Sequence, residues 1–169
     1  MSTILPALSV LFAVLATAVP WGLPADATFI LPLVVVMMVF CWRIIPDAVL
    51  PLFVCMLLGL LTDVMSGGPF GFFALMTLIA ASVGGRLRSL IAPHELRILW
   101  LAWIALAASL GLFGWLLASL YFFRWIDWWP ILFGTLASIA LFPVVLRGLG
   151  WIRQGSLGPA HSAMFRSWS

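Results

Sequence analysis

The sequence predicts an all-α polytopic membrane protein with six transmembrane helices, and three observations lead to this fold class. Hydrophobic residues make up 65% of the 169 residues, charged residues make up 8%, and the mean hydropathy is +1.24. A compact soluble domain of this size cannot bury so much apolar surface. The apolar residues also form long runs between short polar breaks, which indicates spanning helices and not strands that alternate with a period of two.

Prolines and polar residues divide the first part of the chain into three predicted spans, at residues 4–19, 28–45 and 47–65. Residues 16–18 are similar to a signal-peptidase site, but no basic residue precedes the first run, so we expect an uncleaved helix. The pair Pro46-Asp47 predicts the turn into the third span. Pro51 falls in the second turn of that span, where we expect a kink or an unwound start.

The second part of the chain predicts spans at residues 69–85, 98–123 and 130–146. The run at 98–123 would be about 39 Å long as a helix, so it must tilt or protrude from a hydrocarbon core of ~30 Å. The aromatic cluster at residues 121–129, YFFRWIDWW, is typical of a membrane interface. Residues 1–146 therefore form one transmembrane domain, and residues 147–169 are predicted to be a basic, disordered cytoplasmic tail.

The distribution of arginine predicts the orientation of the six spans. A cytoplasmic N-terminus leaves one arginine, Arg124, on the outer side and seven on the inner side. The seven are Arg43, Arg86, Arg88, Arg97, Arg147, Arg153 and Arg166. Positive residues mark the cytoplasmic side, so both termini are predicted to be cytoplasmic.

Residues 59–71, GLLTDVMSGGPFG, place a carboxylate beside a turn and a predicted helix start. The pair Gly67-Gly68 suits a tight turn, and Pro69 suits a first helical turn. The carboxylate of Asp63 is then within reach of the unpaired N–H groups at the start of the next helix, where it would cap them. The alternative is a pocket or partner contact, because intramembrane carboxylates are costly and often functional. Its candidate residues are Asp63, Gly67, Gly68, Pro69 and Gly71.

Two series of small residues at helical spacing predict faces where helices approach closely. In lipid, small side chains let helix backbones gain dispersion contacts. The first face consists of Gly71, Ala74, Ala81 and Gly85, and the second consists of Ala107, Gly111, Gly114 and Ala118. Each face either packs inside the bundle or forms a groove for a membrane helix of another protein.

Motifs that carry catalytic or metal chemistry are missing from the sequence. It contains no phosphate-binding loop, no GxSxG, and no paired carboxylates within one segment. His94-Glu95 lacks the second histidine of a zinc-protease motif, and Cys41 and Cys55 lack metal-like spacing. We therefore expect no enzymatic activity, no metal and no cofactor, and the arginines do not indicate a nucleic-acid partner.

The run Arg43-Ile-Ile-Pro46-Asp47, then Pro51, then GLLTDVMSGGPFGFFAL at residues 59–75, resembles the signature of the rod shape-determining protein MreD family. The best-matched positions are Gly59, Asp63, Gly67, Pro69, Gly71 and Leu75. The chain length, the number of spans, and Phe142-Pro143 followed by Arg147 are also similar to that family. The N-terminus departs from it, because it lacks the basic start that some members have.

The resemblance implies a multi-pass protein of the bacterial inner membrane that belongs to the cell-elongation machinery. The implied partners are MreC and, through it, MreB, RodA and the penicillin-binding peptidoglycan synthases. The implied fold is similar to the S-component of energy-coupling-factor transporters. Two functions follow as alternatives. One is a scaffold that holds partner helices, and the other is the substrate-binding subunit of a vitamin-type transporter, with Asp63 as its polar anchor.

Overall fold

The structure is a computed structural model that describes residues 4–19, 22, 30–45, 50–67, 69–90, 96–121, 123, 125 and 127–156. All regular secondary structure in these ranges is α-helical, which confirms the predicted all-α class. The predicted turn at Pro46-Asp47 and the candidate residue Gly68 lie outside the described residues, as do His94, Glu95, Arg124 and residues 157–169.

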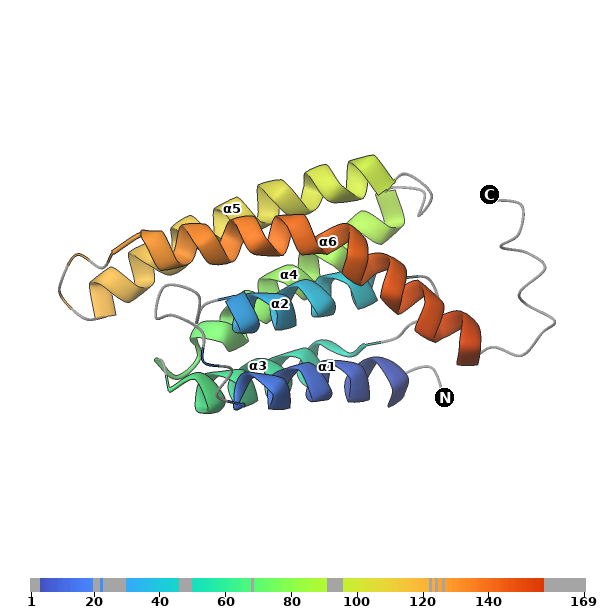
Figure 1. The fold of residues 1–169 in the computed structure, drawn as a ribbon, viewed down its shortest axis with the longest axis horizontal. Helices are drawn as coiled ribbons and strands as arrows, with labels where there is room; N and C mark the ends of the chain where they lie inside the picture. The colour runs from blue at the N-terminus through green and yellow to red at the C-terminus, as the bar shows by residue number, and fades with distance from the viewer. Residues whose placement is uncertain are drawn as a thin grey trace.

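Six helices make up the described part of the chain. They are α1 (Ile4–Thr17), α2 (Ile30–Ile44), α3 (Leu52–Ser66), α4 (Phe72–Leu90), α5 (Leu96–Tyr121) and α6 (Trp129–Ser156). Successive helices run in alternating directions along one axis (Figure 1). The start of α1 and the end of α6 therefore lie at one end of the bundle, whereas the α3–α4 turn and the α5–α6 connection lie at the other.

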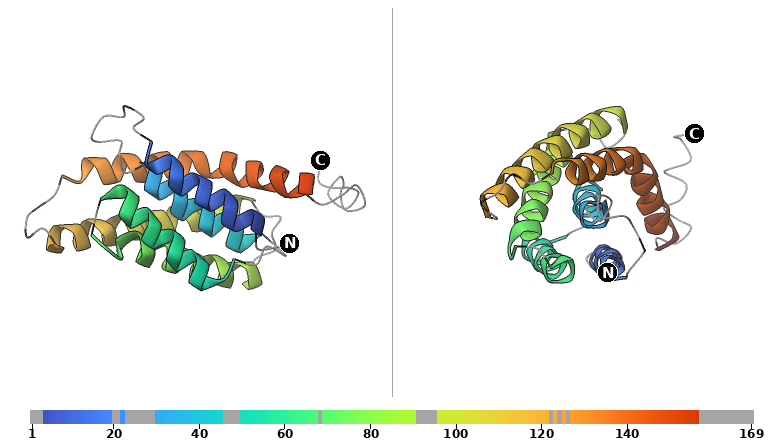
Figure 2. Two further views of the ribbon diagram at one scale, coloured as in Figure 1. Left: turned by 90° about the horizontal axis from the view of Figure 1, so that it is seen from below. Right: turned by 60° about the vertical axis from the view of Figure 1, so that its left-hand side comes forward.

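Helix α2 is the centre of the bundle. It contacts α1, α3, α4 and α6, and the right-hand view of Figure 2 shows it enclosed by its neighbours. Every side chain from Leu31 to Ile45 is buried or half-buried. An apolar helix without a polar face is expected to be buried on all sides, and the run LPLVVVMMVFCW has that character.

Aromatic side chains from three helices form the middle of the core. Phe40 of α2 lies 5.1 Å from Trp103 of α5 and 6.2 Å from Phe142 of α6, measured between ring centroids. Trp103 and Phe142 stack at 5.9 Å with an interplanar angle of 9°. Such pairs each contribute about 0.5–1.5 kcal/mol beyond the burial of their area, so this cluster ties α2, α5 and α6 together.

Helix α3 begins later than the sequence predicts. The expected span began at residue 47, but α3 begins at Leu52, and Pro51 precedes it with φ −59° and ψ 144°. Proline lacks an N–H group and therefore fits the position before a first turn, where none is needed. The unwound start expected around Pro51 is present, because Leu50 and Pro51 are not helical.

The predicted boundaries of α4 are wrong at both ends. Pro69 was expected to open this helix, but it lies in the preceding turn, where its carbonyl accepts a hydrogen bond from the N–H of Phe72 at 3.2 Å. The helix continues past Gly85 to Leu90. Arginine and leucine favour helices, and residues 86–90 contain no proline to stop one.

The predicted disordered tail is wrong for residues 147–156, because α6 extends to Ser156. Leu149 explains the extension in part: its side chain is buried in the core, so this turn of helix gains packing energy that composition does not reveal. Helix α5 also differs slightly from its predicted span, since it begins at Leu96 and ends at Tyr121.

Two of the described helices are long and apolar enough to cross a membrane, namely Arg97–Tyr121 within α5 and Trp129–Trp151 within α6. The apolar segments Ile4–Thr17, Leu31–Ile44 and Leu52–Ser66 are shorter. Length and composition therefore support membrane crossing for α5 and α6.

Candidate functional site: the α3–α4 turn

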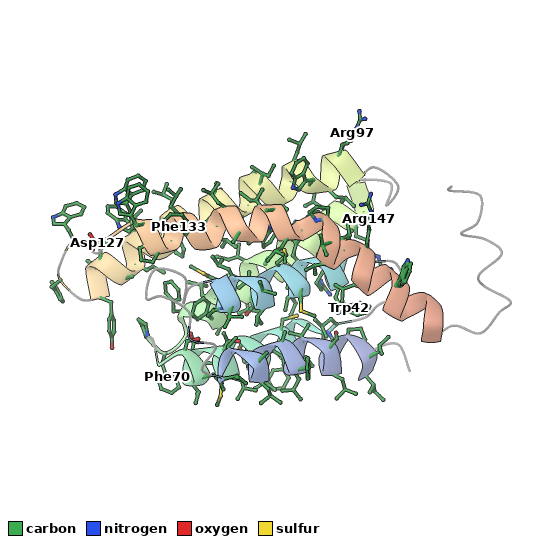
Figure 3. All side chains as sticks on the ribbon, in the orientation of Figure 1. Trp42, Phe70, Arg97, Asp127, Phe133 and Arg147 are labelled. Atoms are coloured by element: carbon green, nitrogen blue, oxygen red, sulfur yellow. The ribbon has the colours of Figure 1, made fainter. Side chains whose placement is uncertain are left out.

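Two glycines shape the turn that joins α3 to α4. Gly67 ends α3 in the left-handed conformation, with φ 65° and ψ 18°, and its N–H donates to the carbonyl of Asp63 at 3.1 Å. Gly71 has φ +90°. Side chains with a Cβ atom rarely adopt these angles, which explains why glycine occupies both positions. Phe70 lies between them and is 80% exposed; it projects from the turn in Figure 3.

The carboxylate of Asp63 caps the start of α4. Its Oδ1 accepts a hydrogen bond from the N–H of Phe73 at 2.7 Å. Its Oδ2 accepts two more, from the N–H of Gly71 at 3.0 Å and of Ala74 at 3.3 Å. The first N–H groups of a helix have no partner within that helix, so Asp63 supplies from α3 what the first turn of α4 lacks.

Burial strengthens this cap. Asp63 is 1% exposed, so its charge is almost entirely removed from solvent. Such a charge is tolerated only where polar groups replace the lost hydration. The three N–H donors do so, and the partial positive charge at the N-terminus of α4 adds to them. The geometry of Asp63 is that of the capping alternative predicted from the sequence.

One helical turn before Asp63, Gly59 marks a close approach of α3 and α4. A Cβ atom at Gly59 would overlap Thr77 Oγ1 and would lie 2.5 Å from the Cα of Ala74. The hydroxyl of Thr77 contacts the carbonyl of Cys55 at 3.2 Å and of Ala74 at 2.9 Å. Gly59 was not among the predicted packing residues, although its position four residues before Asp63 places it on the same helix face.

Further along α4, Arg43 joins α2 to α4 and to the residue Leu50, which precedes α3. Its Nε donates to the carbonyl of Ala81 at 3.0 Å, and its Nη1 donates to the carbonyl of Leu50 at 2.9 Å. The guanidinium lies against Gly85, and the Cβ of Arg43 lies against Gly84. In the sequence, Arg43 served as a sign of orientation and as part of the run that resembles the family signature, and its contacts with α4 were not predicted. The adjacent glycines in α4 were the available signal that a large side chain packs there.

The first small-residue face is divided among different contacts. Gly71 does not belong to it, since it precedes α4 and a Cβ atom there would meet nothing within 4 Å. Ala74 packs against α3 through Gly59, whereas Ala81 and Gly85 pack against Arg43 of α2. The prediction for Gly71 as a packing residue is therefore wrong: its conformation, and not its size, accounts for the glycine.

The second face is covered by the chain itself at its two glycines. A Cβ at Gly111 would lie 2.9 Å from Thr135 Oγ1 of α6. At Gly114 it would overlap the Cε of Met76 and lie 3.1 Å from Phe72 Cζ, both of α4. Ala107 is fully buried, and Ala118 is half-buried. Gly111 and Gly114 thus lie in internal helix contacts, which leaves no room there for a partner helix.

The structure brings Asp63, Gly67, Pro69 and Gly71 together in one turn. Other polar side chains toward this end of the bundle differ in their exposure. Thr62 is buried and donates to the carbonyl of Leu58 at 2.8 Å, whereas Ser66 and Asp127 are exposed. Within the described ranges, no three histidine, cysteine or acidic residues are grouped so that they could hold a metal ion.

The chain was compared with protein-family models, with curated proteins and with solved structures, and none of the three comparisons found a match.

Proposed function

We propose that this protein is a non-enzymatic scaffold of the bacterial cell-elongation machinery in the inner membrane, which maintains rod shape by holding MreC and organising peptidoglycan synthesis. The observation that supports this most is the role of the matched residues. Gly59 allows the α3–α4 contact, Asp63 caps α4, and Gly67 and Gly71 form the turn. The residues that resemble the MreD signature thus act as one structural unit, as a shared fold requires.

All six helices lie in the membrane in this proposal. It is supported by large apolar side chains exposed along the outer faces of four helices, which would be unfavourable in water. Examples are Leu8 and Phe12 of α1, Phe53 and Leu57 of α3, Leu112 and Leu116 of α5, and Phe133 and Val144 of α6. Helices α1 and α3, with 14 and 15 residues, would be only about 21–23 Å long, so the bilayer must thin around them or their flanking residues must enter it.

The orientation follows from the arginines, and it gives a direct test. Reporter fusions placed after Gly68 and after Ser169 are expected to report opposite sides of the membrane, with Ser169 in the cytoplasm. The same side for both fusions would contradict the topology of six spans with cytoplasmic termini. A third fusion after Ser89, in the last turn of α4, serves as the control, since it must agree with the fusion after Ser169.

The scaffold function constrains where a partner helix can bind. The Gly111 and Gly114 positions are filled by α6 and α4, so the spanning helix of MreC is assigned to an exposed apolar face of the bundle. Such faces occur on α1, α3, α5 and α6. In this arrangement the partner helix replaces lipid on an outer face of the bundle and does not enter its core.

The transport alternative has less support. A ligand anchor needs a carboxylate oxygen with free acceptor capacity directed into a pocket. Both oxygens of Asp63 accept hydrogen bonds from the backbone of α4, and the residue is nearly inaccessible. A ligand would have to break the cap in order to bind, which would cost the stability that the cap provides.

Depletion of the protein in a rod-shaped bacterium tests the scaffold function. We expect round, widening cells while growth continues, because loss of a scaffold disturbs the placement of wall synthesis. A transport subunit would instead give starvation that added vitamins reverse. Rod shape that persists through full depletion in growing cells would refute the scaffold function, and re-expression of the intact chain provides the control.

A further inference from the structure

The charged side chains of the described residues are separated along the bundle. Arg43, Arg86, Arg88, Arg97 and Arg147 lie near the end that carries the start of α1 and the end of α6. Within the same described ranges, the carboxylates Asp63 and Asp127 lie toward the opposite end. Figure 3 shows this separation for the labelled residues, with Arg97 and Arg147 far from Asp127 along the long axis.

Four of these arginines are directed outward. Arg86 and Arg88 lie in the last turns of α4, Arg97 lies in the first turn of α5, and Arg147 lies in α6; all four are exposed. Arg43 differs, because it is half-buried and donates to backbone carbonyls inside the bundle. The four exposed arginines, which lie on α4, α5 and α6, are here called the arginine rim. The half-buried Arg43 at the same end of the bundle already has protein partners.

Aromatic side chains accompany the arginine rim. Trp100, in the second turn of α5, is 41% exposed and donates its Nε1 proton to the carbonyl of Ile139 at 3.0 Å, which fixes the ring on the outer surface. Trp151, near the end of α6, is 80% exposed. Tryptophan favours the boundary between hydrocarbon and headgroups, so these two rings place the rim at headgroup level.

The last part of α6 has the character of a helix that lies at this boundary. Helix α6 contains Pro143, and the helix changes direction in its second half, as Figure 1 shows. Arg147 and Trp151 of this segment face outward, whereas Leu149 is buried against the bundle. A segment with basic and aromatic residues outside and an apolar anchor inside suits the surface of an anionic membrane.

We propose that the arginine rim binds the headgroups of anionic phospholipids in the leaflet that faces it. This inference rests on the membrane placement in the proposed function, and it adds the class of lipid. Charge complementarity supports it: each arginine at an anionic surface is worth roughly a fivefold gain in association. Guanidinium groups also pair with phosphate oxygens in a bidentate manner. A zwitterionic headgroup carries a phosphate too, but it has no net negative charge to attract the arginines.

The test uses the full-length purified chain, reconstituted into phosphatidylcholine vesicles that contain spin-labelled phosphatidylglycerol or spin-labelled phosphatidylcholine. We expect the protein to immobilise spin-labelled phosphatidylglycerol more strongly than spin-labelled phosphatidylcholine, by a factor of about five for each arginine that binds a headgroup. High salt is expected to weaken this preference. The variant R86Q/R88Q/R97Q/R147Q is expected to lose the preference. The variant R86K/R88K/R97K/R147K is the matched control and is expected to keep most of it, because charge is retained.

Equal association of the two lipids with the wild-type chain would overturn the inference, and so would an undiminished preference in the glutamine variant. Flotation with the vesicles is measured first. A chain that does not float with them contradicts the membrane placement and this inference together. Lipid preference in a protein whose depletion leaves rod shape intact would refute the scaffold function alone, so the two failures are distinguishable.

Discussion

The Asp63→Ala protein is expected to unfold at a clearly lower temperature than the wild type. The substitution removes the acceptor of three backbone N–H groups, at Gly71, Phe73 and Ala74. An unsatisfied buried polar group costs about 1–3 kcal/mol, so the loss is expected to reach about 3 kcal/mol or more. Thermal unfolding of the purified protein in detergent, followed by tryptophan fluorescence, measures the change.

Asp63→Asn separates the contribution of charge from that of shape. The amide of asparagine keeps one acceptor oxygen. Its NH₂ group replaces the other oxygen, which in the wild type accepts a hydrogen bond from the backbone. We therefore expect stability between that of the wild type and that of Asp63→Ala. Asp127→Asn is the matched control, because Asp127 is exposed, and it should change stability little. Wild-type stability in Asp63→Ala would contradict the capping role.

The same two variants also test for a role beyond capping. If Asp63 acts only as a cap, cell-shape complementation by each variant is expected to follow its abundance in the membrane. A stable Asp63→Asn protein that fails to support rod shape would show that the charge itself serves a partner, contrary to the geometry described above.

The Gly59→Ala protein is expected to show the second large effect, since one methyl group would force α3 and α4 apart. The added Cβ would lie 2.5 Å from the Cα of Ala74, and backbone cannot move aside as a side-chain tip can. Overpacking typically costs about 1–3 kcal/mol, and we expect a value near the upper limit because the contact of Thr77 with the carbonyl of Cys55 would also be strained. Thermal unfolding in detergent again gives the measurement.

Two other glycines calibrate this result. Gly148→Ala adds the same methyl group to a helix where nothing lies within 4 Å, so it should be neutral or slightly stabilising. Gly114→Ala meets the terminal methyl of Met76, which is flexible, and should cost less than Gly59→Ala. Equal tolerance of alanine at Gly59 and Gly148 would show that α3 and α4 are not in close contact at this point.

Helix content and the existence of the turn were within reach of the sequence. Long apolar runs predict helices because every backbone polar group in such a run must be paired internally, and all regular secondary structure in the described segments is α-helical. The cap was also predictable in outline. A carboxylate in the last turns of one helix, followed by a short glycine-rich turn, lies close to the first N–H groups of the next helix. This proximity does not depend on the packing of the other helices.

Helix ends were less predictable, because packing decides where a helix stops. Residues 147–156 contain three glycines and two arginines, yet α6 continues through them with Leu149 buried in the core. Helix α4, in contrast, begins later than predicted. Pro69 is compatible with a first helical turn, but the φ of Gly71 and the carboxylate of Asp63 place the first turn at Phe72. The free energy that the helix propensity of single residues contributes is small compared with that of such tertiary contacts.

The residue pattern alone predicts an apolar, helical chain, a glycine turn beside Asp63, and small residues along parts of α4 and α5. The packing of the folded chain selects the neighbours of its glycines: Gly59 of α3 meets Ala74, Gly85 meets Arg43, and Gly111 meets Thr135. The physical reason is that a small side chain only permits a close approach, whereas the neighbour that makes it is selected by the packing of the whole bundle.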